Sequence, residues 1–385
     1  MIIRGRHYLN GDVYDFDVRD GRIAAISSPS CRDGDLGGED YWIAPGLIDI
    51  QINGYEGIDF CPEEATPEGV CRIAERVAGA GVTAFLPTIT TGSWEAMISG
   101  LQAIARACEG NSLARERILG IHLEGPYISP EDGPRGAHPL AYVRNPDLQE
   151  FCALQDAAGG RIRLITIAPE LPGALDLIAA AAQKGVVIAI GHHAATRSQI
   201  DAAVAAGAVM STHLGNGSHS QLPRHPNYIW EQLANDALMA SIIVDGHHLP
   251  ASVVKSFYRV KGVSRLILVS DAISAAGLPP GRTRLMGLDV ELGSDGAVRL
   301  CGTPYLAGSA LRLCDAISNV VQFAGATFAE AITMASTNPA HLLGVADQRG
   351  HLRIGAPADI SVFRAAPERY ELVATVCGGS ICYQA

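Results

Sequence analysis

Residues 118–127 read Ile-Leu-Gly-Ile-His-Leu-Glu-Gly-Pro-Tyr. Residues 118–123 are short, apolar and partly β-branched, which is typical of a strand buried on both faces of a parallel sheet. Gly125 and Pro126 end this strand. Glu124 lies just before the stop, where an ionised carboxylate is costly unless it meets a proton, a cation or a metal ion. In a closed barrel, this end of the strand is where active sites are built.

Similar apolar segments recur along the chain and alternate with helical patterns, which indicates βαβ units. The predicted strands cover residues 42–52, 82–89, 118–123, 162–167, 186–190, 209–214, 241–244 and 266–269. Predicted helices include residues 67–80 and the alanine-rich segments 175–182 and 200–206. Eight strands with helices between them predict an α/β fold, a TIM-like (β/α)8 barrel over residues 45–349.

The two ends of the chain show a different pattern. Residues 1–44 contain short alternating apolar runs, separated by the hairpin signals Asn10-Gly11 and Asp20-Gly21. These runs predict a small antiparallel sheet. Residues 350–385 are also rich in predicted strands, at 360–363, 372–376 and 380–383. Neither end is large enough to form its own core, so both are predicted to pair into one small β-sandwich domain.

Composition excludes several classes of protein. The chain has 385 residues, and its 29 Lys and Arg against 40 Asp and Glu give a net charge of −11, which argues against a general nucleic-acid binder. The N-terminus lacks the apolar core of a signal peptide, and no apolar run is long enough to cross a bilayer. Nine cysteines without a C-x-x-C motif are expected to be free thiols in a reducing cytoplasm.

Ionisable side chains follow five of the predicted strands. A single histidine in such a position is usually a hydrogen-bonded structural residue, and a single aspartate is often a helix N-cap. Because the carboxyl ends of parallel barrel strands open on one face, five such groups in phase predict a shared site at the barrel mouth. The segments are Glu124, Gly191-His192-His193, Thr212-His213, Asp245-Gly246-His247-His248 and Ser270-Asp271.

Glu124, His192 and His213 form a set of two histidines and one carboxylate. Such a set suits Zn²⁺ in a catalytic site, which keeps an open position for water. Fe²⁺ also fits it. A metal ion there would lower the pKa of its water to about 7 and polarise a carbonyl group. Asp271 is then expected to accept the proton of the water and to pass it to a leaving amine.

The ordered motifs resemble those of the amidohydrolase superfamily and, within it, the N-acetylglucosamine-6-phosphate deacetylases. The resemblance implies a metal-dependent barrel with a small β domain built from both termini. It implies one divalent ion on Glu124, His192 and His213, a catalytic Asp271, and hydrolysis of the N-acetyl amide of an amino-sugar 6-phosphate. The matching segments are Pro45-Gly-Leu-Ile-Asp49, His122-Leu-Glu-Gly-Pro126, Gly191-His192 with Thr196, Thr212-His213-Leu214, Asp245-Gly-x-His248, Ser270-Asp-Ala272 and Leu306-Ala-Gly-Ser309.

The resemblance also implies which residues meet the substrate. His138, in Arg135-Gly-Ala-His138, is implied to lie near the scissile carbonyl group as a second catalytic residue. In the family, the arginine that matches Arg224 reaches phosphate across a dimer interface, which implies a homodimer. The implied substrate-contact residues are Ala137, His138, Asn216, Gly217, Arg224, Asp245, Gly246, His247, His248, Leu306, Ala307 and Gly308.

Two segments depart from the family's pattern. Where the superfamily often has His-x-His, which supplies a second metal, this chain reads Gln51-Ile52-Asn53, so one tight metal site is expected. Gln51 is expected either to reach the same mouth or to face a helix or form a hydrogen bond. After His213 the family usually reads Leu-Tyr-Asn-Ala-Met, whereas residues 214–218 read Leu-Gly-Asn-Gly-Ser.

The altered segment after His213 leaves other substrates open. One alternative is deacylation of another N-acyl compound, such as the galactosamine epimer, a non-phosphorylated N-acetyl sugar or an N-acyl amino acid. A non-catalytic scaffold is a further alternative. The retained ligand set and Asp271 argue against it, because a scaffold has no chemical use for them.

Overall fold

An eight-stranded parallel sheet forms the centre of the molecule, in a computed structural model that describes residues 1–31, 33–60, 65–285, 288–303 and 305–385. A parallel bridge between Ile52 and Ala272 joins the first strand to the segment after the last, so the sheet closes into the predicted barrel. In sheet order, the strands are β14 (Leu266–Leu268), β13 (Met239–Ile242), β12 (Ala208–Ser211), β11 (Val187–Ile190), β10 (Ile162–Ile167), β9 (Ile121–Glu124), β8 (Val82–Thr90) and β5 (Leu47–Ile52).

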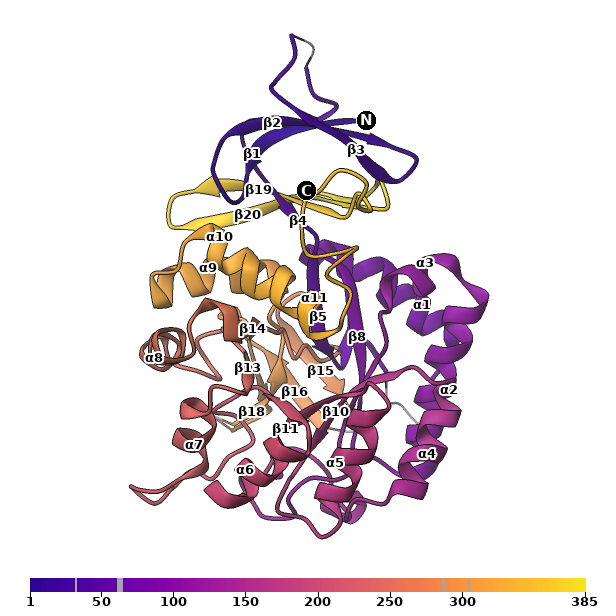
Figure 1. Cartoon of the computed structure of the whole chain (residues 1–385), viewed down its shortest axis with the longest axis vertical. Coiled ribbons are helices and arrows are strands. Elements are labelled where there is room, and N and C mark those ends of the chain that lie inside the picture. Colours follow the sequence, from indigo (N-terminus) through magenta and orange to yellow (C-terminus); the bar gives the residue numbers. More distant parts are fainter. Residues whose placement is uncertain (32, 61–64, 286–287, 304) are drawn as a thin grey trace.

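Helices surround this barrel (Figure 1). Several begin at a residue whose side chain accepts a hydrogen bond from the first turn, as Thr66, Ser93 and Asp147 do for α1, α2 and α4. The helices are α1 (Pro67–Arg76), α2 (Trp94–Gly110), α3 (Ser112–Arg117), α4 (Leu148–Ala157), α5 (Ala174–Gln183), α6 (Arg197–Ala206), α7 (Tyr228–Ala234), α8 (Ala251–Lys261), α9 (Leu313–Ala324), α10 (Phe328–Ile332) and α11 (Asn338–Leu342).

The prediction of one strand over residues 42–52 is wrong. The chain leaves β4 (Leu36–Pro45) at Gly46 and then enters β5 of the barrel. A Cβ atom on Gly46 would lie only 2.1 Å from the Thr83 hydroxyl, so only glycine fits where the backbone crosses this barrel strand.

Other predicted boundaries also shift. β9 covers Ile121–Glu124 instead of residues 118–123, and β12 and β13 end before the predicted residues 214 and 244. The helix predicted over 67–80 is α-helical only to Arg76, and Val77–Ala80 form a 3₁₀ turn. The shifts at β12 and β13 have a functional consequence, because they place the ionisable residues on the loops that follow the strands.

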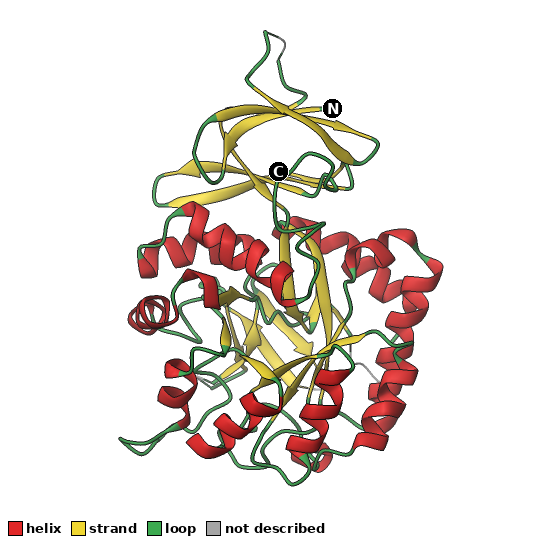
Figure 2. Cartoon of the chain, viewed as in Figure 1, coloured by secondary structure: helices red, strands yellow, loops and turns green. Residues whose placement is uncertain are grey.

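Both termini join in one seven-stranded sheet, as predicted, and its two halves lie in two layers above the barrel (Figure 2). The predicted antiparallel pairing within residues 1–44 is confirmed for the first three strands but is wrong for β4, which pairs with β1 in parallel. The sheet order is β21 (Ser380–Gln384), β20 (Arg369–Cys377), β19 (Ile360–Ala366), β4, β1 (Ile2–His7), β2 (Val13–Arg19) and β3 (Arg22–Ser27).

A four-stranded antiparallel sheet between β14 and α9 was not predicted. Its small apolar cluster includes Val290, Leu292 and Val298. A parallel bridge between Ala272 and Ser309 ties the sheet to the segment that carries Asp271. Its strands are β15 (Gly281–Leu285), β16 (Leu288–Leu292), β17 (Ala297–Leu300) and β18 (Leu306–Ser309).

Two predictions from composition concern the membrane and the cysteines. Within the described ranges, no helix has both the length and the apolar character needed to cross a bilayer. The described cysteines are all free, as predicted. Cys61 lies outside the described residues.

A buried lysine closes the C-terminal end of α7. Lys261 is 1% exposed, and its Nζ donates hydrogen bonds to the carbonyl oxygens of Gln232, Asn235 and Leu238 at 2.7–2.9 Å. Burial lowers the pKa of Lys261 to about 8, yet the three acceptors match the three N–H groups of an ammonium ion. This contact holds the end of α8 against the end of α7 and the segment that follows it.

Replacing Lys261 with Met is expected to lower the free energy of unfolding by about 2 kcal/mol or more, because the variant leaves buried carbonyl groups without donors. Urea unfolding measures the change. Lys255→Met, at an exposed position of the same helix, is the matched control and is expected to change stability by less than about 0.5 kcal/mol. Equal stability of the two variants would contradict the role of Lys261.

Candidate active site

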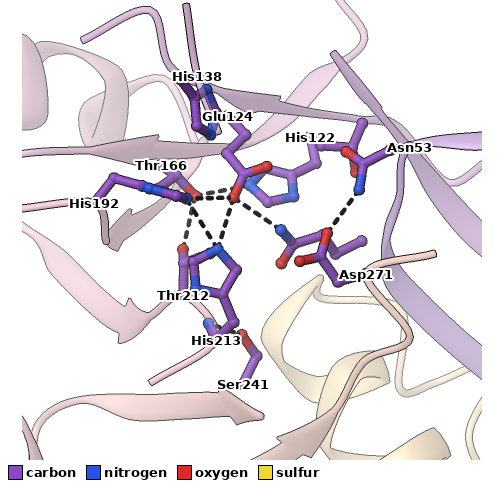
Figure 3. A network of polar contacts seen from close by, with 12 residues as sticks. Asn53, His122, Glu124, His138, Thr166, His192, Thr212, His213, Ser241 and Asp271 are labelled. Atoms are coloured by element: carbon purple, nitrogen blue, oxygen red, sulfur yellow. Dashed lines mark hydrogen bonds and ion pairs between the residues drawn. The ribbon is translucent and has the colours of Figure 1, made fainter. Parts of the chain in front are cut away.

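Three side chains from different strands meet at one rim of the barrel (Figure 3). Glu124 is the last residue of β9, whereas His192 and His213 follow β11 and β12 by two residues each. All three side chains are buried. Their ligand-type atoms lie within 4.8 Å of one another, and the described residues contain no other group of this kind.

The spacing of these atoms fits a tetrahedral metal ion. Glu124 Oε1 lies 2.9 Å from His213 Nε2 and 3.3 Å from His192 Nε2, and the two Nε2 atoms are 3.1 Å apart. Bonds of about 2.0–2.1 Å to one ion would place two ligand atoms roughly 3.3 Å apart. His192 Nδ1 donates to Pro134 O at 2.8 Å, so Nε2 carries the lone pair. Lone pairs at this separation repel unless a cation or proton lies between them.

The backbone is strained where it presents the site. His192, His213 and Asp271 have φ values of 50°, 27° and 48°, a region that non-glycine residues rarely adopt. Each such residue costs about 1–3 kcal/mol and persists where its surroundings hold it. Here the Ser129 N–H donates to His192 O, and the His213 N–H donates to Ser241 Oγ. The bend after each strand aims the side chain across the mouth.

Two carboxyl groups at the mouth have opposite pKa shifts. Burial pushes the pKa of Glu124 up, but the close contacts with the imidazole rings of His192 and His213 outweigh it and hold this pKa well below its usual range. Burial and the nearby charge of Glu124 raise the pKa of Asp271 to about 6. Glu124 is therefore suited to remain an anion that binds a cation, and Asp271 to exchange a proton near neutral pH.

Gln51 and Asn53 also reach the mouth. Gln51 Nε2 donates to Glu124 Oε1 at 2.8 Å, and Asn53 Nδ2 donates to Asp271 Oδ1 at 2.6 Å. Gln51 therefore reaches the mouth, which was one of its predicted alternatives, and it does so through a hydrogen bond, which was part of the other. Asn53 had no predicted role, because a polar residue after a strand is an ordinary turn signal.

A hydroxyl network beneath the ligands was missed by sequence reasoning. His122 Nε2 and Thr166 Oγ1 are 2.8 Å apart, and Thr166 Oγ1 lies 2.7 Å from Thr212 Oγ1. Burial lowers the pKa of His122 to about 4, so its imidazole is neutral. The detectable signal was position, since His122 lies two residues before Glu124 and points to the same side of β9.

His138 lies directly beside the triad formed by Glu124, His192 and His213. Its ring centroid is 4.4 Å from that of His192, and its Nδ1 is 2.9 Å from Thr91 Oγ1. Burial, followed by the neighbouring His192, lowers the pKa of His138 to about 3, so the ring is neutral. Where the Thr91 hydroxyl donates to Nδ1, Nε2 carries the proton and is available to a substrate.

Two predicted contact segments flank His192. One contains Ala137, and the other contains Asn216 and Gly217. A Cβ atom on Gly217 would lie 2.7 Å from the His192 ring, so this backbone packs directly on the imidazole. The Nδ2 of Asn216 is buried and has no hydrogen-bond partner among the described residues. Ala137 immediately precedes His138. These predicted contact residues are therefore adjacent to the triad.

The predicted contacts after β13 divide into two groups. His248 Nδ1 bonds to Asp245 Oδ2 at 2.6 Å, which leaves its Nε2 for another partner. His247 Nε2 instead bonds to the carbonyl oxygen of Asp295, in the turn between β16 and β17. Gly246 lies between Asp245 and His247 and has a left-handed φ of 79°. Leu306, Ala307 and Gly308 lie on β18, close in the chain to the Ala272–Ser309 bridge.

The structure does not bring Arg224 to the triad of its own chain. Its side chain is exposed and forms no hydrogen bond or ion pair within the described part of the chain. The loop before α7, which carries Arg224, extends outward from the barrel (Figure 1).

Known proteins are similar to this chain over nearly their whole length. The N-acetylgalactosamine-6-phosphate deacetylase of Escherichia coli O157:H7 is 34% identical over 368 residues, covering 93% of this chain and 94% of the relative. The N-acetylglucosamine-6-phosphate deacetylase of Homo sapiens is 34% identical over 401 aligned positions, covering 100% of this chain and 94% of the relative.

A solved structure shows the same architecture. A point mutant of the N-acetyl-D-glucosamine-6-phosphate deacetylase of Mycobacterium smegmatis, in complex with N-acetyl-D-glucosamine-6-phosphate, has a TM-score of 0.88 at 28% identity. It matches 100% of this chain and 99% of that one. The sequence profile of the Amidohydrolase family matches residues 42–382. With the barrel, the buried triad and these relatives in agreement, the chain belongs to the Amidohydrolase family.

Proposed function

We propose that the protein hydrolyses the N-acetyl amide of an amino-sugar 6-phosphate, such as N-acetylglucosamine-6-phosphate, to the free amine and acetate. The observation that carries this proposal is the triangle of Glu124, His192 and His213 atoms, spaced like ligands of one tetrahedral ion. Relatives of nearly the same length that are deacetylases of amino-sugar 6-phosphates support the choice of substrate.

In this proposal, Glu124, His192 and His213 hold one divalent ion, with Zn²⁺ preferred because imidazole and carboxylate donors suit it. Fe²⁺ is the alternative. A bound ion would polarise the amide carbonyl and lower the pKa of a water molecule. Gln51 keeps the Glu124 carboxylate turned toward the histidines through its 2.8 Å hydrogen bond.

Asp271 and His138 act on the two ends of the reacting amide. Asp271 accepts a proton from the attacking water and transfers it to the amine nitrogen as the C–N bond breaks, so the carboxylate is regenerated. His138 donates a hydrogen bond to the carbonyl oxygen as negative charge develops there. A donor of this kind typically contributes about 3–4 kcal/mol. Its neutral ring suits that role, because it already carries a proton on one nitrogen.

A phosphorylated substrate requires a cationic or donor-rich pocket. Arg224 presents the planar fork that binds phosphate oxygens, and its exposed position supports binding across a homodimer, with His248 as a second donor. Asn216, with its unpaired Nδ2, supplies a further buried donor. The free cysteines and the phosphorylated substrate support a cytoplasmic location.

The galactosamine epimer is the second candidate substrate. It is favoured by the E. coli relative, an N-acetylgalactosamine-6-phosphate deacetylase with 34% identity. Both epimers carry the same scissile amide and phosphate, so the same groups would act on either. Rates on the two epimers, each with and without the 6-phosphate, decide between the candidates.

The proposed metal ligands are tested by His192→Ala and His213→Ala. Each variant is expected to lose bound metal and hydrolysis together, because two remaining ligands do not hold a divalent ion tightly. Metal analysis of the purified proteins measures the first effect. His341→Ala, at an exposed position of α11, is the control. Full metal occupancy in both site variants would refute the assignment.

Asp271→Asn is expected to retain metal and fold but to lower kcat by roughly 10²–10⁴-fold. In the wild type, only the ionised carboxylate accepts a proton, so kcat should fall as pH decreases through the pKa of Asp271. That pKa is about 6 before a cation binds, and a cation would lower it, so the acidic limb is expected at or below about pH 6. Near-normal turnover of the variant would mean that another group is the base.

Arg224→Ala is expected to raise KM strongly for the 6-phosphorylated sugar and to leave the unphosphorylated sugar nearly unaffected, because only the former needs the guanidinium group. Steady-state kinetics on both sugars test this. If the arginine acts across a dimer, dilution of the wild type to monomer should reproduce the effect. Equal wild-type rates on both sugars would instead favour a different N-acyl substrate.

A further inference from the structure

Two amides at the end of β5 each hold one of the two carboxyl groups of the site. Gln51 and Asn53 are two residues apart, so their side chains leave the chain on the same side. Gln51 Nε2 donates to Glu124 Oε1. Asn53 Nδ2 donates to Asp271 Oδ1 (Figure 3). At 2.6 Å, the contact of Asn53 with Asp271 is the shorter of the two, typical of a donor that faces an ionised acceptor.

The backbones of these two segments are already joined without the side chains. The Asp271 N–H donates to Gln51 O at 3.0 Å, and the Asn53 N–H donates to Ala272 O at 2.8 Å. The carbonyl oxygen of Asn53 accepts from the Phe60 N–H at 2.9 Å. The turn therefore forms without the Asn53 amide, and the one recorded partner of that amide is Asp271.

The chemistry of the contact assigns its direction. Asp271 Oδ1 is an acceptor when ionised, so the amide atom that faces it is the N–H donor Nδ2. A carboxylate held through one oxygen cannot rotate freely about its χ angles, and its second oxygen then points in a defined direction. The left-handed backbone of Asp271, with φ of 48°, adds to the need for such a restraint.

We propose that Asn53 is a positioning residue that holds Asp271 Oδ1, so that Oδ2 faces the reacting water and amine. This inference rests on the proposed role of Asp271 as acid and base. Gln51 holds the Glu124 carboxylate in the same way, so the C-terminal end of β5 aligns both carboxyl groups. Asn53 itself touches neither substrate nor metal in this scheme.

The test is the kinetics of Asn53→Ala on the acetylated sugar phosphate, with Zn²⁺ supplied. We expect kcat to fall by roughly 10- to 100-fold, because the reacting group is no longer aligned. KM should change by less than about twofold, since Asn53 contributes no substrate contact. Metal content should equal that of the wild type. An unchanged kcat, or a loss of metal that accounts for the fall, would overturn the inference.

Asn53→Asp distinguishes hydrogen bonding from shape. It keeps the size of the side chain but replaces the N–H donor with an acceptor beside Asp271, so its kcat is expected to be no better than that of Asn53→Ala. Full activity of Asn53→Asp would show that packing alone matters and would overturn the proposal.

Asn338→Ala is the matched structural control. Asn338 is 6% exposed, and its Nδ2 donates to Val263 O and Leu266 O at 2.7 Å, where α11 packs on the barrel. This variant should lower the melting temperature and leave kcat unchanged. A kcat loss in Asn338→Ala as large as in Asn53→Ala would assign the effect to general destabilisation. Failure of the proposed function would look different, because the wild type itself would then be inactive on every acetylated sugar.

Discussion

Burial of the Glu124 carboxylate is the constraint around which the barrel mouth is arranged. An ionised carboxylate removed from water costs several kcal/mol unless opposite charge and hydrogen bonds compensate it. Its Oε1 atom lies 2.8–3.3 Å from the Nε2 atoms of Gln51, His192 and His213, which come from three different segments of the chain. The Gln51 N–H stabilises the anion, and a divalent cation shared with the two imidazole rings would stabilise it further.

The barrel makes this convergence possible because it fixes strand ends to one rim. Glu124, His192 and His213 come from strands β9, β11 and β12, and even the two histidines are 21 positions apart in the chain. Each histidine adopts a left-handed backbone just beyond its strand. Hydrogen bonds to neighbouring segments offset that strain, so the stability of the scaffold is used to hold an otherwise unfavourable geometry.

The two carboxyl groups of the mouth differ in role because their surroundings differ. Glu124 faces two imidazoles and remains anionic, whereas burial and the Glu124 charge raise the pKa of Asp271 to about 6, although the hydrogen bond from Asn53 lowers it. Two carboxyl groups thus differ in function: one is suited to cation binding and the other to proton transfer. This separation is the electrostatic basis of a hydrolytic site.

Sequence alone predicted the alternating barrel, the pairing of both termini and the strand-end residues Glu124, His192, His213 and Asp271 that meet at the mouth. These features leave local signals, since apolar periodicity, turn residues and strand-end polarity are read within a few positions. The division of β4 from β5 at Gly46, the parallel β1–β4 pairing and the β15–β18 sheet depended on tertiary contacts. So did the bond from Asn53 to Asp271, which joins residues 218 positions apart. No local pattern encodes such a contact, because it forms only when the closing barrel brings its first and last strands together.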